Sequence, residues 1–136
     1  MGRNPYAVLY ECENMANFSC NLSDWLTLDF DREWLEANVR WKDFGTGVRL
    51  GRLAREDNTS LVLYDADAEV EVEAFQRHMH PGGEAYLVLS GEVYDEFGTY
   101  PAGSIVWMDP GTEHNPKTRE RTLILVLWPD GVKITS

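Results

Sequence analysis

The chain has 136 residues, of which 43% are hydrophobic and 12% aromatic, so we expect one globular domain over residues 1–136 with a sizeable core. Its 12 Lys and Arg against 23 Asp and Glu give a formal net charge of -11, which disfavours nucleic acids and anionic membranes as partners. Neither a signal-like segment nor an apolar run of bilayer length is found, so we expect a cytoplasmic protein.

Short strand-like runs dominate the first half of the chain, separated by Gly, Asn and Asp. The pattern predicts strands over residues 6–11, 47–54 and 60–64, and one helical turn over 31–37 with Asp31 as its N-cap. We expect both cysteines to be reduced and packed, because nothing indicates an oxidising compartment. The tryptophans that precede the second half are expected in the core, and a lid or a dimer contact is the alternative: Trp25, Trp34 and Trp41.

Residues 65–74 alternate strictly between acidic side chains at odd positions and small apolar ones at even positions. A period of two predicts a strand with one acidic face in water and one apolar face inside. If that phase continues, His78 and His80 point into the domain.

All three histidines fall in one short pattern, His78-Met79-His80-Pro81-Gly82-Gly83-Glu84 followed by His114. The Pro-Gly-Gly turn reverses the chain, so Glu84 opens a returning strand opposite the histidine pair. Three imidazoles and one carboxylate suit iron, zinc, nickel, copper or manganese, so the donors alone do not select the metal, and we expect iron or zinc first. The pattern therefore predicts one divalent transition metal per chain.

Further strands are predicted over residues 84–91, 104–108 and 123–128, and residues 109–111 form a turn that delivers His114. The run 123–128 is apolar on both faces, so we expect it to be buried on both. Tyr86 shares the inward face with Glu84, where core packing is the ordinary role and hydrogen bonding to a bound substrate is the functional one. Many short strands and one small helix indicate an all-β sandwich or barrel.

The residues His78, His80, Glu84 and Gly91 resemble the first motif of the cupin superfamily, and Gly103, Gly111 and His114 resemble the second. The resemblance is specific over residues 77–116. The stretches HPGGE and DEFGTYPAGS are similar to the ChrR-like subgroup, which contains the sensor domain of ChrR-type anti-sigma factors and relatives of acetylacetone-cleaving and dihydroxyacetophenone-cleaving dioxygenases.

The resemblance implies a double-stranded β-helix that holds one metal through His78, His80, Glu84 and His114. It implies a small-molecule substrate, and we expect a non-haem dioxygenase acting on a carbonyl or diketone compound, with Glu84 and Tyr86 as catalytic candidates. The alternatives are a zinc-containing binding or sensing module without turnover, and an isomerase or lyase acting on a sugar acid. An anti-sigma role is not expected. ChrR-type anti-sigma factors carry an upstream zinc domain that contains cysteines and histidines, and here no histidine precedes His78.

A homodimer is also expected. The apolar run 123–128 and the sheet edges of a small jelly roll are often covered by a second copy of the chain.

Overall fold

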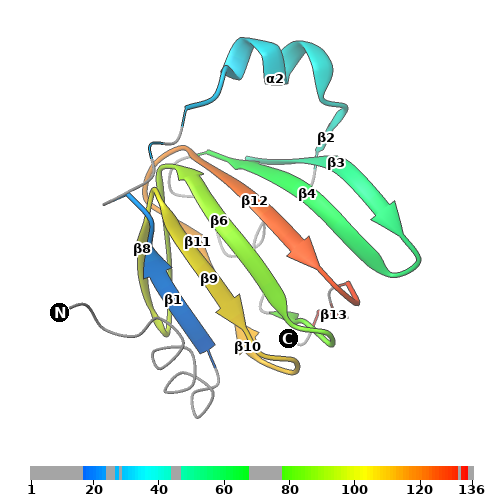
Figure 1. Ribbon diagram of the computed structural model, residues 1–136, viewed down its shortest axis with the longest axis vertical. Helices are drawn as coiled ribbons and strands as arrows, with labels where there is room; N and C mark the ends of the chain where they lie inside the picture. Colours follow the sequence, from blue (N-terminus) through cyan, green and yellow to red (C-terminus); the bar gives the residue numbers. More distant parts are fainter. Residues whose placement is uncertain are drawn as a thin grey trace, which may run out of the picture.

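The computed structural model describes residues 17–23, 27, 29–43, 47–67, 78–131 and 133–134. Within them the chain is almost entirely β, with one short helix beyond the end of the large sheet (Figure 1). In the described part of the chain no helix is long and apolar enough to cross a membrane. The elements in chain order are β1 (Asn17–Asn21), α2 (Arg32–Asn38), β2 (Trp41–Asp43), β3 (Val48–Glu56), β4 (Thr59–Ala66), β5 (His78–Met79), β6 (Glu84–Ser90), β7 (Glu92–Asp95), β8 (Gly98–Pro101), β9 (Ser104–Met108), β10 (Glu113–His114), β11 (Lys117–Thr118), β12 (Thr122–Trp128) and β13 (Lys133–Ile134).

Seven strands form one antiparallel sheet in the order β1-β9-β6-β12-β4-β3-β2. Two three-stranded sheets, β10-β5-β13 and β11-β7-β8, complete the fold. Because side chains alternate along a strand, the even-numbered residues of β6 and β12 face the interior. They share one core with residues of β3, β4, β7, β8 and β9: Val48, Val62, Tyr64, Ala66, Tyr86, Val88, Val93, Tyr100, Val106, Met108, Ile124 and Val126.

The helix begins at its predicted N-cap and ends at Asn38, one residue beyond the predicted end. Asp31 is the N-cap, and its carboxylate accepts hydrogen bonds from the backbone N–H groups of Glu33 (2.9 Å) and Trp34 (3.1 Å). No helical residue is buried, and Trp34 is 57% exposed. The expectation that Trp34 belongs to the core is therefore wrong, because this face of α2 contacts no layer of the described protein.

The prediction that the acidic side chains of residues 65–74 lie in water is wrong at Asp65. Its side chain does lie on the face opposite Ala66, as the alternation requires, but it is only 4% exposed. Arg49 Nη2 donates to it at 2.7 Å and Arg121 Nη2 at 2.9 Å, so cationic side chains replace the expected water. Residues 68–74 lie outside the described part of the chain.

Two other burial expectations fail, and three predictions fall outside the described residues. In β12 the outward Leu127 is 37% exposed, because a single chain leaves this face of the sheet uncovered. Cys20 is exposed on edge strand β1 and not packed. Cys12, Trp25 and the strand predicted over residues 6–11 lie outside the described residues.

Candidate metal centre and adjoining pocket

Two tight turns bring the histidine and carboxylate side chains together. His80 follows β5 directly, and its carbonyl oxygen accepts hydrogen bonds from Gly83 N and Gly111 N, both at 3.0 Å. Gly83 has a φ of +86°, and a Cβ at this position would lie 2.8 Å from the Met108 carbonyl oxygen, so only glycine fits the turn. The His80 carbonyl oxygen thus connects the turn before Glu84 and the turn before His114 by hydrogen bonds.

Strand pairing places His114 beside the histidine pair. In the register of β5 and β10 the Cα partner of His114 is His78, which puts the backbone of the first predicted ligand next to the last. The structure describes the backbone of His78, and its role as a ligand stays a prediction.

His80, Glu84 and His114 form a buried group whose ligand atoms all lie within 4.8 Å of one another. His80 Nε2 lies 2.9 Å from Glu84 Oε2 and 3.2 Å from His114 Nε2, and His114 Nε2 lies 3.7 Å from Glu84 Oε1. The three side chains are at most 6% exposed.

These distances fit one small metal ion. Two imidazole nitrogens that each lie about 2.1 Å from an ion are separated by about 3.0 Å at a right angle and about 3.4 Å at the tetrahedral angle. The observed separation of 3.2 Å between the Nε2 atoms of His80 and His114 lies between these two values. The donor set of two imidazoles and one carboxylate suits a divalent transition metal.

Glu84 is held as an acceptor in this group. Its burial raises the pKa, but a hydrogen bond and charge from His80, charge from His114 and a hydrogen bond from Trp128 outweigh burial and hold the pKa of Glu84 below its ordinary value. The indole Nε1 of Trp128 donates to Glu84 Oε2 at 2.7 Å. The same indole stacks on the His80 ring, with ring centroids 6.2 Å apart and planes inclined by 22°.

On its other ring nitrogen, His114 contacts a buried carboxylate that sequence reasoning missed. His114 Nδ1 lies 3.1 Å from Asp95 Oδ2, and the Asp95 side chain is 0% exposed. Asp95 and Trp128 are far from the histidines in sequence, and only the hairpin β7–β8 and the strand β12 bring them to the site. An acidic residue at a strand end is also common in ordinary turns, so its pattern alone gave no signal.

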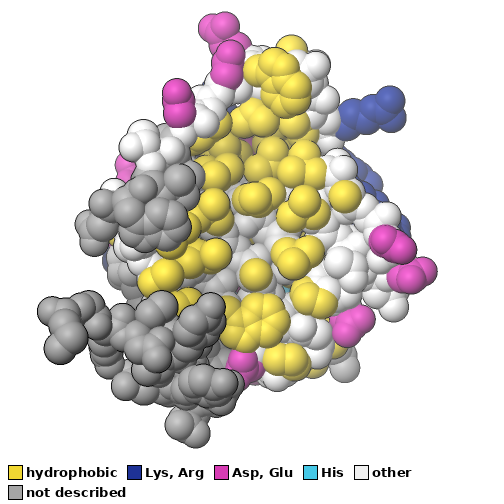
Figure 2. All heavy atoms as spheres, in the orientation of Figure 1, with side chains coloured by type: hydrophobic (Ala, Val, Ile, Leu, Met, Phe, Trp, Pro, Cys, Tyr) yellow, Lys and Arg dark blue, Asp and Glu magenta, His cyan; other side chains and the backbone are white. Residues whose placement is uncertain are grey.

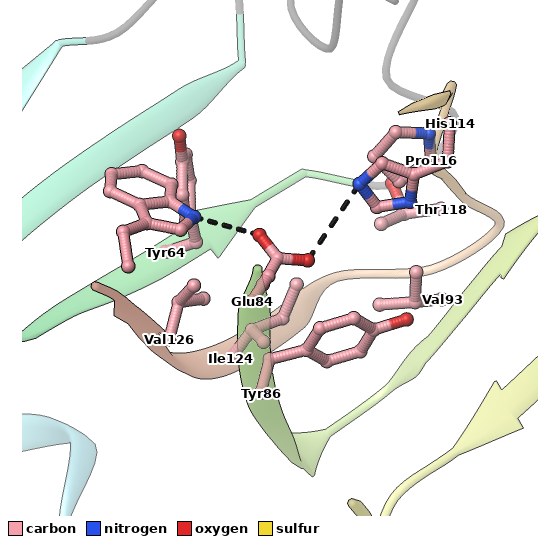
Figure 3. A pocket seen from close by; sticks show the side chains of 10 residues that line it. Tyr64, Glu84, Tyr86, Val93, His114, Pro116, Thr118, Ile124 and Val126 are labelled. Atoms are coloured by element: carbon pink, nitrogen blue, oxygen red, sulfur yellow. Dashed lines mark hydrogen bonds and ion pairs between the residues drawn. The ribbon is translucent and has the colours of Figure 1, made fainter. Parts of the chain in front are cut away.

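A pocket of about 40 Å³ adjoins the group and opens to solvent. Glu84, His114 and Trp128 form part of its wall, and Tyr86 points into it (Figure 3). The remaining lining residues are mostly apolar, and none of the described residues that line it is Lys or Arg: Tyr64, Val93, Pro116, Thr118, Ile124 and Val126.

Tyr86 presents a buried hydroxyl to this pocket. The residue is 4% exposed, and among the described residues its Oη has no hydrogen-bond partner. Burial first, then the negative charges of Glu84 and Asp95, raises the pKa of Tyr86 well above its ordinary value. The phenol therefore stays neutral and keeps a hydrogen-bond donor for a group that enters the pocket.

Comparison with known proteins agrees with the predicted double-stranded β-helix. The sequence profile described as ChrR Cupin-like domain matches residues 35–129. Rhodobacter sphaeroides ChrR, solved in complex with SigE, is 27% identical with a TM-score of 0.58, over 71% of this chain and 53% of that chain. The chain thus spans about half the length of that protein. Comparison with curated proteins gives no match.

Two further solved structures share the fold at lower identity. An RmlC-like cupin from Ralstonia eutropha is 19% identical, with a TM-score of 0.61 over 76% of this chain and 67% of that chain. Streptomyces albus HEPD, with 2-hydroxyethylphosphonate and Fe(II) bound, is 17% identical, with a TM-score of 0.53 over 70% of this chain and 25% of that chain. The predicted all-β cupin fold is confirmed.

Proposed function

The chain belongs to the ChrR Cupin-like domain family, and we propose that it is a metal-dependent dioxygenase that acts on a small, neutral carbonyl compound of the diketone type. The observation that carries the proposal is one pocket lined both by Glu84 and His114 of the candidate metal-binding group and by Tyr86, whose buried hydroxyl has no partner among the described residues. A metal-binding group and a positioned hydrogen-bond donor in one apolar pocket are the parts that such a reaction needs.

The metal would be held by His80, Glu84 and His114, with His78 as the fourth ligand. Iron or zinc is the metal that we propose first, and nickel, manganese and copper are compatible with the same donors. A bound divalent ion supplies Lewis acidity toward a carbonyl oxygen, and iron adds one-electron chemistry toward oxygen. The HEPD structure gives a precedent for Fe(II) in this fold.

The walls of the pocket favour a neutral substrate. Glu84 contributes a negative charge and no described lining residue contributes a positive one, so away from the bound ion the walls offer no cationic partner to a carboxylate or phosphonate. Tyr86 would donate a hydrogen bond to one carbonyl oxygen, while Val93, Ile124 and Val126 would contact the hydrocarbon part. The same argument weighs against the alternative of an isomerase or lyase acting on a sugar acid.

Glu84 would have a second role. If the substrate displaced it from the metal, this carboxylate would be ionised at neutral pH and able to accept a proton. The carbon between the two carbonyl groups of a diketone is the acidic position of such a substrate. Glu84 would take that proton and leave an enolate held by Tyr86.

The test is metal content followed by oxygen uptake. We expect about one metal per chain in protein purified without chelator, and oxygen consumption by the Fe(II)-loaded protein with pentane-2,4-dione, both oxygen atoms entering the acid and oxoaldehyde products. His114→Ala should lose metal and activity, and Glu84→Gln should lose activity. Glu113→Gln, an exposed carboxylate on the same strand as His114, is the matched control and should keep both.

A zinc-containing sensing module without turnover is the second candidate. It is supported by the similarity to ChrR, which was solved in complex with SigE. Tight zinc binding, with no oxygen uptake by the Fe(II)-loaded protein on any of a panel of diketones, would favour this candidate over the enzyme.

We also propose that the chain forms a homodimer through the outer face of the seven-stranded sheet. Figure 2 shows this face covered by hydrophobic side chains, with charged ones at its rim. In a chain with a formal net charge of -11, an uncharged face is where two copies approach with least repulsion. Residues of β1, β4, β6, β9 and β12 share this face by register: Phe18, Leu61, Leu63, Ala85, Leu87, Ile105, Trp107, Leu125 and Leu127.

A further inference from the structure

We infer that Asp95 is a positioning residue that fixes the tautomer and the ring orientation of His114, so that the Nε2 lone pair of His114 faces His80 and Glu84. The consequence for metal affinity rests on the proposed metal site. The tautomer itself is a property of the metal-free protein.

The inference begins with the hydrogen bond at the outer side of the ring. Asp95 Oδ2 lies 3.1 Å from His114 Nδ1, and water has no access to the Asp95 side chain, which is 0% exposed. A carboxylate accepts hydrogen bonds and does not donate them, so Nδ1 must carry the hydrogen. In a neutral imidazole Nε2 then has the free lone pair, and this atom lies 3.2 Å from His80 Nε2.

Asp95 is itself fixed by its own turn. Its Oδ1 accepts hydrogen bonds from Phe97 N at 2.8 Å and from Gly98 N at 3.2 Å, which close the turn between β7 and β8. Oδ1 is thus occupied, and Oδ2 is left for the imidazole. The carboxylate cannot rotate away without breaking both turn hydrogen bonds.

The same turn contacts the His114 segment at a second point. Glu96 Oε1 accepts a hydrogen bond from the backbone N–H of Asn115 at 2.8 Å. Consecutive residues of the β7–β8 turn therefore bind the His114 ring and the backbone directly after it. This second contact fixes the strand, while the Asp95 contact fixes the ring.

Asp95→Asn tests the contact with the His114 ring while the turn hydrogen bonds are kept. The amide oxygen can still accept from Phe97 N and Gly98 N, and an inverted amide would place its NH₂ group against these two donors. The NH₂ group therefore takes the place of Oδ2 and donates to Nδ1, which moves the imidazole hydrogen to Nε2. A protonated Nε2 cannot bind a metal until the tautomer is reversed, so affinity should fall by about 10- to 100-fold, as for other groups that orient a ligand.

The experiment uses the full chain and two measurements. Long-range ¹H–¹⁵N NMR of the metal-free protein, above the ordinary histidine pKa of about 6.5, reports the tautomer of each of the three histidines. Competition with a chromophoric chelator reports the affinity for Zn(II). Glu96→Gln is the matched control, because it removes the neighbouring charge in the same turn and its amide oxygen can still accept the hydrogen bond from Asn115 N.

We expect Nδ1–H on His114 in the wild type and in Glu96→Gln, and Nε2–H with weakened zinc binding in Asp95→Asn. Nε2–H in the metal-free wild type overturns the inference even if the variant does not fold. Unchanged tautomer and zinc affinity in a folded Asp95→Asn also overturn it. A wild type that binds no zinc but shows the Nδ1–H tautomer refutes the proposed metal site and leaves the positioning of His114 by Asp95 standing.

Discussion

Trp128 and Glu84 form a hydrogen bond of 2.7 Å between the indole Nε1 and carboxylate Oε2, on neighbouring strands β12 and β6. The same oxygen lies 2.9 Å from His80 Nε2, and the indole ring stacks on the His80 imidazole. One aromatic side chain from the last long strand thus orients two of the three described candidate ligands.

Trp128→Phe removes the donor to Glu84 and keeps a ring against His80. We expect Zn(II) affinity to fall about tenfold, since a group that orients a ligand is lost. We also expect a loss of about 2 kcal/mol of unfolding free energy, since the hydrogen bond is made to a charged group. Zinc competition and urea unfolding measure the two effects. Trp41→Phe, whose indole donates to the Leu35 carbonyl at 3.2 Å, should leave zinc affinity unchanged.

Tyr86→Phe tests the role assigned to the pocket hydroxyl. Since no described residue bonds this hydroxyl, its removal should leave the free energy of unfolding unchanged or raise it by up to about 1 kcal/mol. The value of kcat/KM for a diketone should fall about tenfold, because the substrate loses a hydrogen bond in an apolar pocket. Tyr100→Phe, the edge-on neighbour of Tyr86, is the control. Equal losses of activity in both variants would contradict the assignment.

From the lowered pKa of Asp65 we expect the protein to lose stability in acid. Burial raises its pKa, but hydrogen bonds from Arg121 and Arg49 outweigh burial and lower the pKa to about 2. A folded-state pKa below the unfolded value of about 3.9 gives stability that is complete above about pH 4 and is lost as the pH falls toward 2. We expect Asp65→Asn to lose about 2 kcal/mol at neutral pH and to show a flatter stability profile in that window. An unchanged slope between pH 4 and 2 would contradict this origin.

Leu127→Glu tests the proposed homodimer. Leu127 points outward from β12 and is 37% exposed, so a carboxylate there is solvated in a monomer and buried in a dimer formed through this face. Sedimentation should give a dimer for the wild type and a monomer for the variant. Phe97→Glu, at a 51% exposed position in the β7–β8 turn, should remain dimeric. A monomeric wild type at high concentration would refute the proposal.

The sequence by itself determined the all-β class and the candidate histidines and carboxylate, because these depend on local patterns, and its resemblance to the cupin motifs supplied the double-stranded β-helix. Period-two alternation and Pro-Gly turns specify β6, β9 and the turns before Glu84 and His114. The capped helix at Asp31 is likewise a local signal.

Only the tertiary structure decided which polar side chains surround the ligands and which are buried. Asp95 and Trp128 reach His114 and Glu84 through strand pairings that no short-range pattern encodes, and Asp65 is buried because arginines from other elements cover it. Trp34 and Leu127 are exposed for the converse reason, since apolar character does not specify a partner surface. Burial and hydrogen bonding depend on the neighbouring side chains, and the fold determines which side chains are neighbours.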